Sequence, residues 1–128
     1  MTTAIAALIG SGKYVSKGVH EQVWSANVSG RGNYLDAAAL PDKTVHILGP
    51  STGGGSSRII LEGTNEAYPT TPTARWTTLT SPTDGDFDFT AMVTVGIIRA
   101  IRENPRYIRP HFETVTTGET LGVIIISR

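Results

Sequence analysis

Residues 121–126 read Leu-Gly-Val-Ile-Ile-Ile, the most continuous apolar run of the chain and the best guide to its fold. Successive side chains of a strand point to opposite faces of a sheet, so this strand would be apolar on both faces. We therefore expect it in the middle of a sheet and not at an edge.

Upstream of this run, several stretches are predicted to be strands. Thr44–Leu48 and Asp86–Thr90 alternate with period two, and Arg58–Thr64 is largely apolar through its centre. We also expect strands at Arg106–Phe112 and, as a short edge element, at Trp76–Leu79. Residues 92–101 are Val/Ile-rich, and their alternation is interrupted at Ile97-Ile98. This predicts either one strand with a bulge beside Gly96 or two separate strands. Seven or eight strands, turn signals every 8–12 residues and no convincing helix predict an all-β fold. We expect an antiparallel two-sheet sandwich of jelly-roll topology with an extended N-terminal arm.

The N-terminal part of the chain differs from the rest. Ala4–Ile9 is apolar, Gly10-Ser11-Gly12 would end any helix, and residues 29–33 form a loop. We divide the chain into residues 1–35, an arm with the first strand that is weakly tied to the core, and residues 36–128, the sandwich domain. An apolar arm without its own core must bury itself on another surface, either its own domain or another subunit.

Composition excludes several classes of protein. The 128 residues carry 11 cations and 11 anions, which argues against a dedicated nucleic-acid-binding protein. There is no cysteine, and therefore no disulfide, thiolate metal site or cysteine nucleophile. The longest apolar run is far shorter than a membrane span, and no basic segment precedes the apolar N-terminus as in a secretory signal. We expect a protein made in a cytoplasm that binds neither nucleic acid nor membrane.

Charge is uneven along the chain: residues 1–35 carry +2, residues 36–95 carry −4 and residues 96–128 carry +2. Two interpretations of this pattern are open. Either it is ordinary scatter, or the acidic residues 36–95 complement a basic end of a neighbouring copy or partner. Arg106 and Arg109, with Arg99 and Arg102 upstream, would form a basic cluster that is too small for nucleic acid and could meet such an acidic surface.

Catalytic motifs are absent or incomplete. His20, His46 and His111 lie far apart in strand-like segments, and none has a local partner for a nucleophile relay. Gly10-Ser11-Gly12-Lys13 lacks the first glycine and the Ser/Thr of a phosphate-binding loop. We expect no enzyme and no cofactor. A hydrolase would instead require a pocket that unites a histidine with a carboxylate.

Two kinds of binding site remain open. Asp84, Asp86 and Asp88 could form a calcium site, although a solvated strand face with Phe87 and Phe89 pointing inward explains the same spacing. Trp24, Trp76 and the four tyrosines could form a platform for sugars, although a tryptophan in the core of a sandwich is the commoner arrangement.

Three segments carry a resemblance to a known class of proteins. These are Ile59-Ile60-Leu61-Glu62-Gly63-Thr64-Asn65-Glu66, Trp76-Thr77-Thr78-Leu79 and Arg106-Tyr107-Ile108-Arg109-Pro110. Their order, within residues 58–126, resembles small virion proteins of tailed bacteriophages and also discoidin-type jelly rolls. The chain departs from discoidin domains because it lacks the cysteines that join their termini. The resemblance to virion proteins implies a β-sandwich that decorates or cements a capsid.

We therefore expect a capsid decoration (cement) protein that binds the major capsid protein on the virion surface as a homo-oligomer, either a dimer or a trimer. The bacterial host cytoplasm would be its place of synthesis. Ile5, Leu8, Ile9 and Tyr14 are the residues we expect to contact a neighbouring chain. The alternative is a tail-associated or carbohydrate-binding β-sandwich module.

Overall fold

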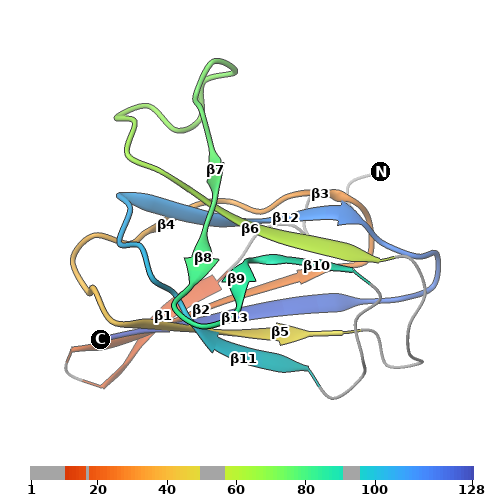
Figure 1. Ribbon diagram of the computed structural model, residues 1–128, viewed down its shortest axis with the longest axis horizontal. Coiled ribbons are helices and arrows are strands. Elements are labelled where there is room, and N and C mark those ends of the chain that lie inside the picture. Colours follow the sequence, from red (N-terminus) through yellow and green to blue (C-terminus); the bar gives the residue numbers. More distant parts are fainter. Residues whose placement is uncertain (1–10, 17, 50–56, 91–95) are drawn as a thin grey trace.

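The computed structural model describes residues 11–16, 18–49, 57–90 and 96–128 as a β-sandwich of two antiparallel sheets (Figure 1). Sheet A contains, in spatial order, β1 (Ser11–Ser16), β2 (Val19–Ala26), β13 (Leu121–Ser127), β5 (Lys43–Leu48) and β11 (Ile97–Ala100). Sheet B contains β10 (Asp88–Thr90), β6 (Arg58–Thr64), β12 (Tyr107–Thr114) and β3 (Gly30–Arg31), with β4 (Leu35–Asp36) on β12 and β7 (Thr77–Thr78) on β6. A separate ribbon joins β8 (Thr80–Ser81) and β9 (Gly85–Asp86).

The order in which the chain visits the sheets identifies the topology. Sheet A takes β2, β5, β11 and β13, and sheet B takes β3 with β4, β6, β10 and β12. The chain thus changes sheet at every connection between these strands except the one from β6 to β10. This alternation, with the last strand between β2 and β5, is the jelly roll. The predicted fold class is confirmed, and so is the central position of the last strand.

The core lies between the inward faces of the two sheets. The alternation of β5 buries Val45 and Ile47, and that of β12 buries Ile108 and Phe112. The largest fully buried side chains are Trp24, Phe87, Phe112, Ile47, Ile59, Leu61, Ile108, Leu121, Ile125, Val45 and Val123. Phe87 points inward as expected, and Phe89 packs against it edge-on with ring centroids 6.0 Å apart.

Residues 19–36 are tied to the sandwich more closely than the expected arm would be. β2 pairs with β13 along seven residues, and its Trp24 is 1% exposed. The indole Nε1–H of Trp24 donates to the carbonyl oxygen and the side-chain Oδ1 of Asn33, at 2.9 and 3.0 Å. The sequence of β2 is mixed because its buried positions include the polar Gln22 beside Trp24, and its outward positions include the apolar Val23 beside Glu21.

The Val/Ile-rich stretch before the chain's last third is described from Gly96 onward. Gly96 has a positive φ of 81°, and β11 begins directly after it. A Cβ at this position would lie 2.9 Å from both the His46 Nε2 and the Ile47 carbonyl oxygen. Glycine is therefore required here by both conformation and space. The predicted bulge itself falls partly on residues 91–95, which lie outside the described residues.

A buried cation fixes one end of the sandwich. Lys43 is 3% exposed, and its ammonium donates to the Leu40 carbonyl oxygen at 2.6 Å and to Asn104 Oδ1 at 2.5 Å. Burial lowers the pKa of Lys43, while the neighbouring Asp42 charge acts in the opposite direction. These bonds hold two connections together that are 61 residues apart in sequence.

Among the described residues, no helix has the length and apolar character needed to cross a membrane.

Candidate interaction surfaces

The predicted partner-binding residues lie at or before the first strand. Ile5, Leu8 and Ile9 fall outside the described residues. Tyr14 belongs to β1, where its backbone pairs with His20 on β2. Ser11, the first described residue, belongs to β1 at the edge of sheet A.

The two tryptophans occupy different environments. Trp24 is part of the core, as is usual for a sandwich, and is not available to a ligand. Trp76 is half-buried on the outside of sheet B, just before β7. Tyr68 is 76% exposed on the segment between β6 and β7, which projects away from the sandwich (Figure 1). A single aromatic platform that includes both tryptophans is therefore excluded.

The four arginines predicted to cluster are divided between two surfaces. Arg99 on β11 pairs with Asp84 at 2.8 Å, and Arg102 donates to the Pro82 carbonyl oxygen at 3.1 Å. Arg106 and Arg109 belong to the β12 region of sheet B. The prediction of one basic cluster is wrong because the chain crosses from sheet A to sheet B between Arg102 and Arg106.

The acidic residues of the possible calcium site also point to different partners. Asp88 accepts two hydrogen bonds from Arg58, at 2.7 and 2.8 Å, and these bonds lower the pKa of its carboxyl. Asp84 pairs with Arg99, and Asp86 is exposed. The described ranges contain no group of three or more His, Cys, Asp or Glu side chains that could hold a metal ion. Asp84 lies in the turn before β9, Asp86 on β9 and Asp88 on β10, and all three residues are exposed.

The outer face of sheet B carries a polar groove of about 510 Å³ that the projecting segment overhangs. Its floor is the pair Glu62–Arg109, which the strand register places directly opposite each other. Arg109 Nε donates to Glu62 Oε1 at 2.6 Å, and Arg31 Nε lies 3.6 Å from the same oxygen. The guanidinium of Arg109 lies over the Trp76 ring, 3.8 Å from its centroid. The walls are formed by Pro69, Thr70, Thr71, Pro72 and Ala74.

Hydrogen bonds within the projecting segment hold the groove wall in place. Glu66 accepts hydrogen bonds from the backbone N–H and the Nε–H of Arg75, at 2.6 and 3.2 Å. The backbone bond is the largest cause of a lowered pKa for the Glu66 carboxyl. Thr71 donates to the Tyr68 carbonyl oxygen through both its backbone N–H and its hydroxyl. A segment braced in this way presents its side chains at a lower entropic cost than a free loop.

His111 lies on the same face, beside Arg31 of β3 in the register. Its pKa is lowered, first by burial and then by the charge of Arg31. The imidazole is therefore favoured in its neutral form, and the cations of this face are the arginines.

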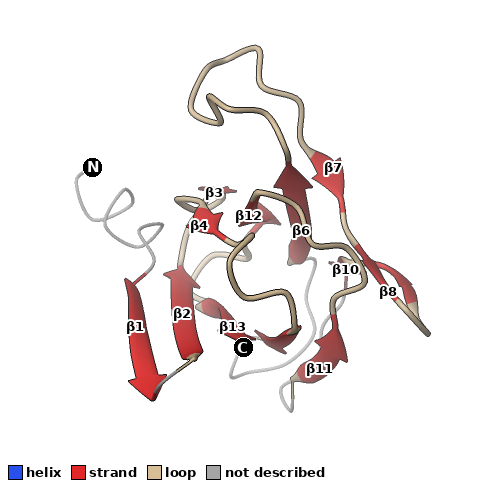
Figure 2. Ribbon diagram, turned by 90° about the vertical axis from the view of Figure 1, so that its left-hand side faces the viewer, coloured by secondary structure: helices blue, strands red, loops and turns tan. Residues whose placement is uncertain are grey.

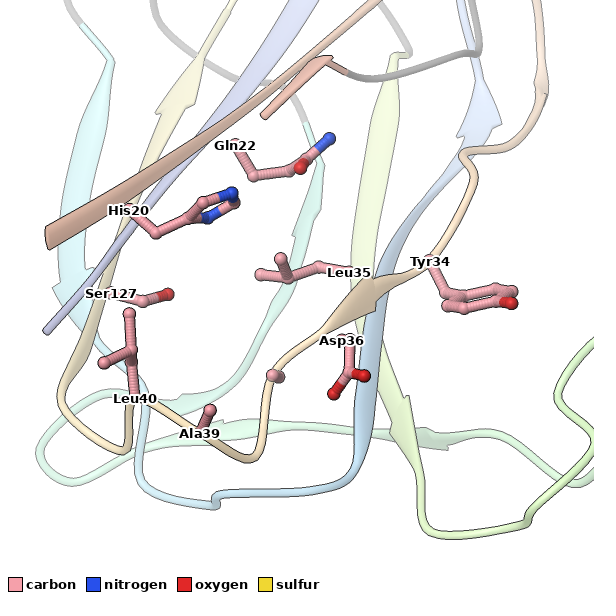
Figure 3. Close-up of a pocket in the computed structure, with 9 residues that line it drawn as sticks. His20, Gln22, Tyr34, Leu35, Asp36, Ala39, Leu40 and Ser127 are labelled. Carbon is pink, nitrogen blue, oxygen red and sulfur yellow. The ribbon is translucent and has the colours of Figure 1, made fainter. Parts of the chain in front are cut away.

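A second cavity of about 260 Å³ opens between β2, β13 and the connection at residues 34–40 (Figure 3). It brings His20, Asp36 and Ser127 to one cavity, the combination that a hydrolase would require. Ser127 Oγ is buried and has no hydrogen-bond partner in the described part of the chain. Figure 3 shows the Asp36 carboxylate directed away from the His20 imidazole. The hydrogen-bonded relay from nucleophile to base to carboxylate is thus not formed in this arrangement.

Sequence comparison finds no matching protein family and no matching curated protein. The chain is similar in structure to the SPBc2 prophage-derived protein YomS, with a TM-score of 0.56 and 15% identity. The match covers 85% of this chain and 95% of YomS. A cupin domain from Bordetella pertussis Tohama I covers 92% of this chain, with 12% identity and a TM-score of 0.43, too low to bear on function. The chain therefore shares its fold with a prophage-derived protein.

Proposed function

We propose that this chain is a structural protein of a tailed-phage particle that binds the outside of the capsid as a decoration protein. The observation that carries the proposal is the jelly roll that it shares with a prophage-derived protein over nearly the whole of both chains. The major capsid protein is the proposed partner, and the virion surface is the proposed location. Synthesis in the cytoplasm of the bacterial host is part of the same proposal.

The groove on sheet B supports a role in protein binding. Tryptophan and arginine are enriched among residues that dominate the binding energy of protein interfaces. Here Arg109 is held by Glu62 and stacked on Trp76, so the side chains are ordered before a partner arrives. Arg31, whose side chain is 53% exposed, lies at the same groove and is available to a carboxylate of the partner.

Attachment through several copies completes the proposal. Ile5, Leu8, Ile9 and Tyr14 are proposed to contact a neighbouring chain in a homo-oligomer. A weak contact that is repeated around a symmetry axis gives strong net attachment through effective concentration. A decoration protein of this kind needs no catalytic residue and no cofactor.

The number of copies per particle tests this proposal. Quantitative mass spectrometry of purified particles should give a ratio to the major capsid protein near one, or near a simple fraction such as one third. A handful of copies per particle would place the chain in the tail or neck, and its absence from particles would overturn the proposal.

Co-sedimentation of variants with undecorated capsids tests the groove itself. We expect Arg109→Ala to weaken capsid binding at least tenfold. Arg102→Ala is the matched control, because the Arg102 side chain is exposed outside the groove and donates to the Pro82 carbonyl oxygen. Equal binding by both variants would remove the groove from the proposal, provided that circular dichroism shows both to be folded.

The second candidate function is a tail-associated or carbohydrate-binding module. It is favoured by the exposed Tyr68 and the half-buried Trp76, which belong to the same projecting segment. A glycan array with the purified protein tests it, and Trp76→Ala and Tyr68→Ala should each abolish any signal. Binding that survives both substitutions would exclude these residues as a sugar platform.

A further inference from the structure

The outer face of sheet A is more apolar than is usual for an exposed sheet face, although Glu21, Thr44 and His46 also point outward. An antiparallel sheet with one solvated face alternates apolar and polar side chains along each strand. β13 departs from this rule, because its inward positions are buried and its outward positions include Ile124 and Ile126. Leu48 of β5 also faces outward, and Ile98 of β11 is 61% exposed.

The register aligns several of these side chains into one row across the sheet. Val23 of β2 lies opposite Ile124 of β13, Ile124 lies opposite His46 of β5, and His46 lies opposite Ile98 of β11. We call Val23, Ile124, His46 and Ile98 the apolar row, in which the His46 imidazole is the one polar side chain. It contains no carboxylate, lysine or arginine, and Figure 2 shows no described element on the side of sheet A that faces away from sheet B. Contiguous apolar surface of this kind marks an interaction site.

The start of β1 lies at one end of the apolar row. Ser11, the first described residue, pairs with Val23, and the segment Ala4–Ile9 precedes it in the sequence. Its sequence, Ala-Ile-Ala-Ala-Leu-Ile, carries no charge. Six extended residues span roughly 20 Å. The line from Ser11 on β1 to Ile98 on β11 crosses five strands, and the four spacings between them also amount to roughly 19 Å. Length and polarity of the segment therefore match the row.

We propose that the apolar row binds residues 4–9 of a second copy of this chain, so that two copies exchange their N-terminal segments. Reciprocal exchange around a two-fold axis buries the apolar segments of both copies and closes the assembly. The proposal rests on the proposed role of Ile5, Leu8 and Ile9 as contacts with a neighbouring chain, and it adds the surface that receives them.

Cross-linking between copies tests the exchange directly, since the chain contains no cysteine of its own. One preparation carries Ala7→Cys, and a second carries Thr44→Cys on the outward side of β5 next to the apolar row. After mixing, a short bismaleimide should join the two variants into a covalent dimer. Thr77→Cys replaces Thr44→Cys in the control, because Thr77 is an exposed threonine of sheet B. Cross-linking should be at least tenfold lower in the control.

Two results of this cross-linking experiment would overturn the proposal. If the double variant Ala7→Cys/Thr44→Cys cross-links within one chain while the mixture does not, the segment covers its own sheet. If neither cross-links, the row is free or receives another partner, such as the capsid protein. The experiment uses no capsid, so its failure leaves attachment to the particle to be decided by the copy number.

Light scattering after size exclusion provides a second test. Ile98→Lys should raise the dissociation constant of the dimer at least tenfold, because a charge then enters the row. Ile60→Lys, at an outward isoleucine of sheet B, should leave the dimer unchanged. A dimer that both variants weaken equally, or that neither weakens, would contradict the proposal.

Discussion

The ion pair between Glu62 and Arg109 should contribute measurably to stability as well as order the groove. The two side chains are 10% and 18% exposed, and the bond between Arg109 Nε and Glu62 Oε1 is 2.6 Å long. A hydrogen bond to a charged group contributes about 1.5–3 kcal/mol. Removing one partner of a fully buried pair costs more, because the other charge stays behind without compensation. Arg31 and the Trp76 ring remain as partial compensation here.

From these contacts we expect Glu62→Gln to lower the free energy of unfolding by about 2 kcal/mol. Arg109→Met should lower it by about 3 kcal/mol, since it leaves a buried carboxylate beside the more exposed Arg31 and also removes the cation–π contact. The double variant should cost less than the sum of the two, with a coupling energy of about 1–2 kcal/mol. Urea unfolding of the four proteins, followed by circular dichroism, measures this coupling.

The pair Arg58–Asp88 provides the matched control. Its bond is 2.7 Å long, but its side chains are 39% and 33% exposed. Solvent screening should therefore make the coupling energy of Arg58→Met with Asp88→Asn smaller than that of the Glu62–Arg109 pair. If the Glu62–Arg109 coupling is no larger than that of the control pair, burial does not strengthen the groove pair and the reasoning fails.

Three further predictions concern single positions. Gly63→Ala should destabilise the protein by about 1–3 kcal/mol in urea unfolding, because a Cβ would lie 2.7 Å from Pro105 Cγ; an unchanged midpoint would contradict this packing. His111→Gln should reduce the loss of stability between pH 7.5 and pH 5. The unfolded chain takes up a proton near pH 6.5 that the folded chain resists, and equal slopes in both proteins would refute this. Trp24→Phe should cost about 2 kcal/mol in thermal unfolding, since it removes the bonds to Asn33 and leaves a gap; a cost below about 0.5 kcal/mol would show that these bonds contribute little.

Strands with clear alternation are predicted correctly from sequence because their burial is a local property. Residues 44–48 and 58–64 agree with β5 and β6 to within one residue, and the double-sided apolar pattern of 121–126 places β13 correctly. In each case the pattern of apolar side chains along the strand indicates which of its faces are buried. The sequence of β2 shows no clear apolar alternation, because Gln22 and His20 stand at inward positions near an open end of the sandwich.

The groove could not be predicted, because it depends on register between distant segments. Glu62 and Arg109 are 47 residues apart, and only the pairing of β6 with β12 places them opposite each other. Arg31 reaches the same carboxylate through β3, a strand of two residues that carries no periodic signal. The same limitation explains the basic cluster that is not formed, since Arg99 and Arg109 are near in sequence but lie on opposite sheets.

The position of β13 has a consequence for the order in which the protein can be assembled on the ribosome. This strand pairs with β2 on one side and with β5 on the other, yet it is synthesised after every other described strand. Until residues 121–127 emerge, β2 and β5 have no shared neighbour and each exposes an unpaired edge. Sheet A must therefore form after its other strands have left the ribosome, and nascent chains that lack these residues should associate through the open gap.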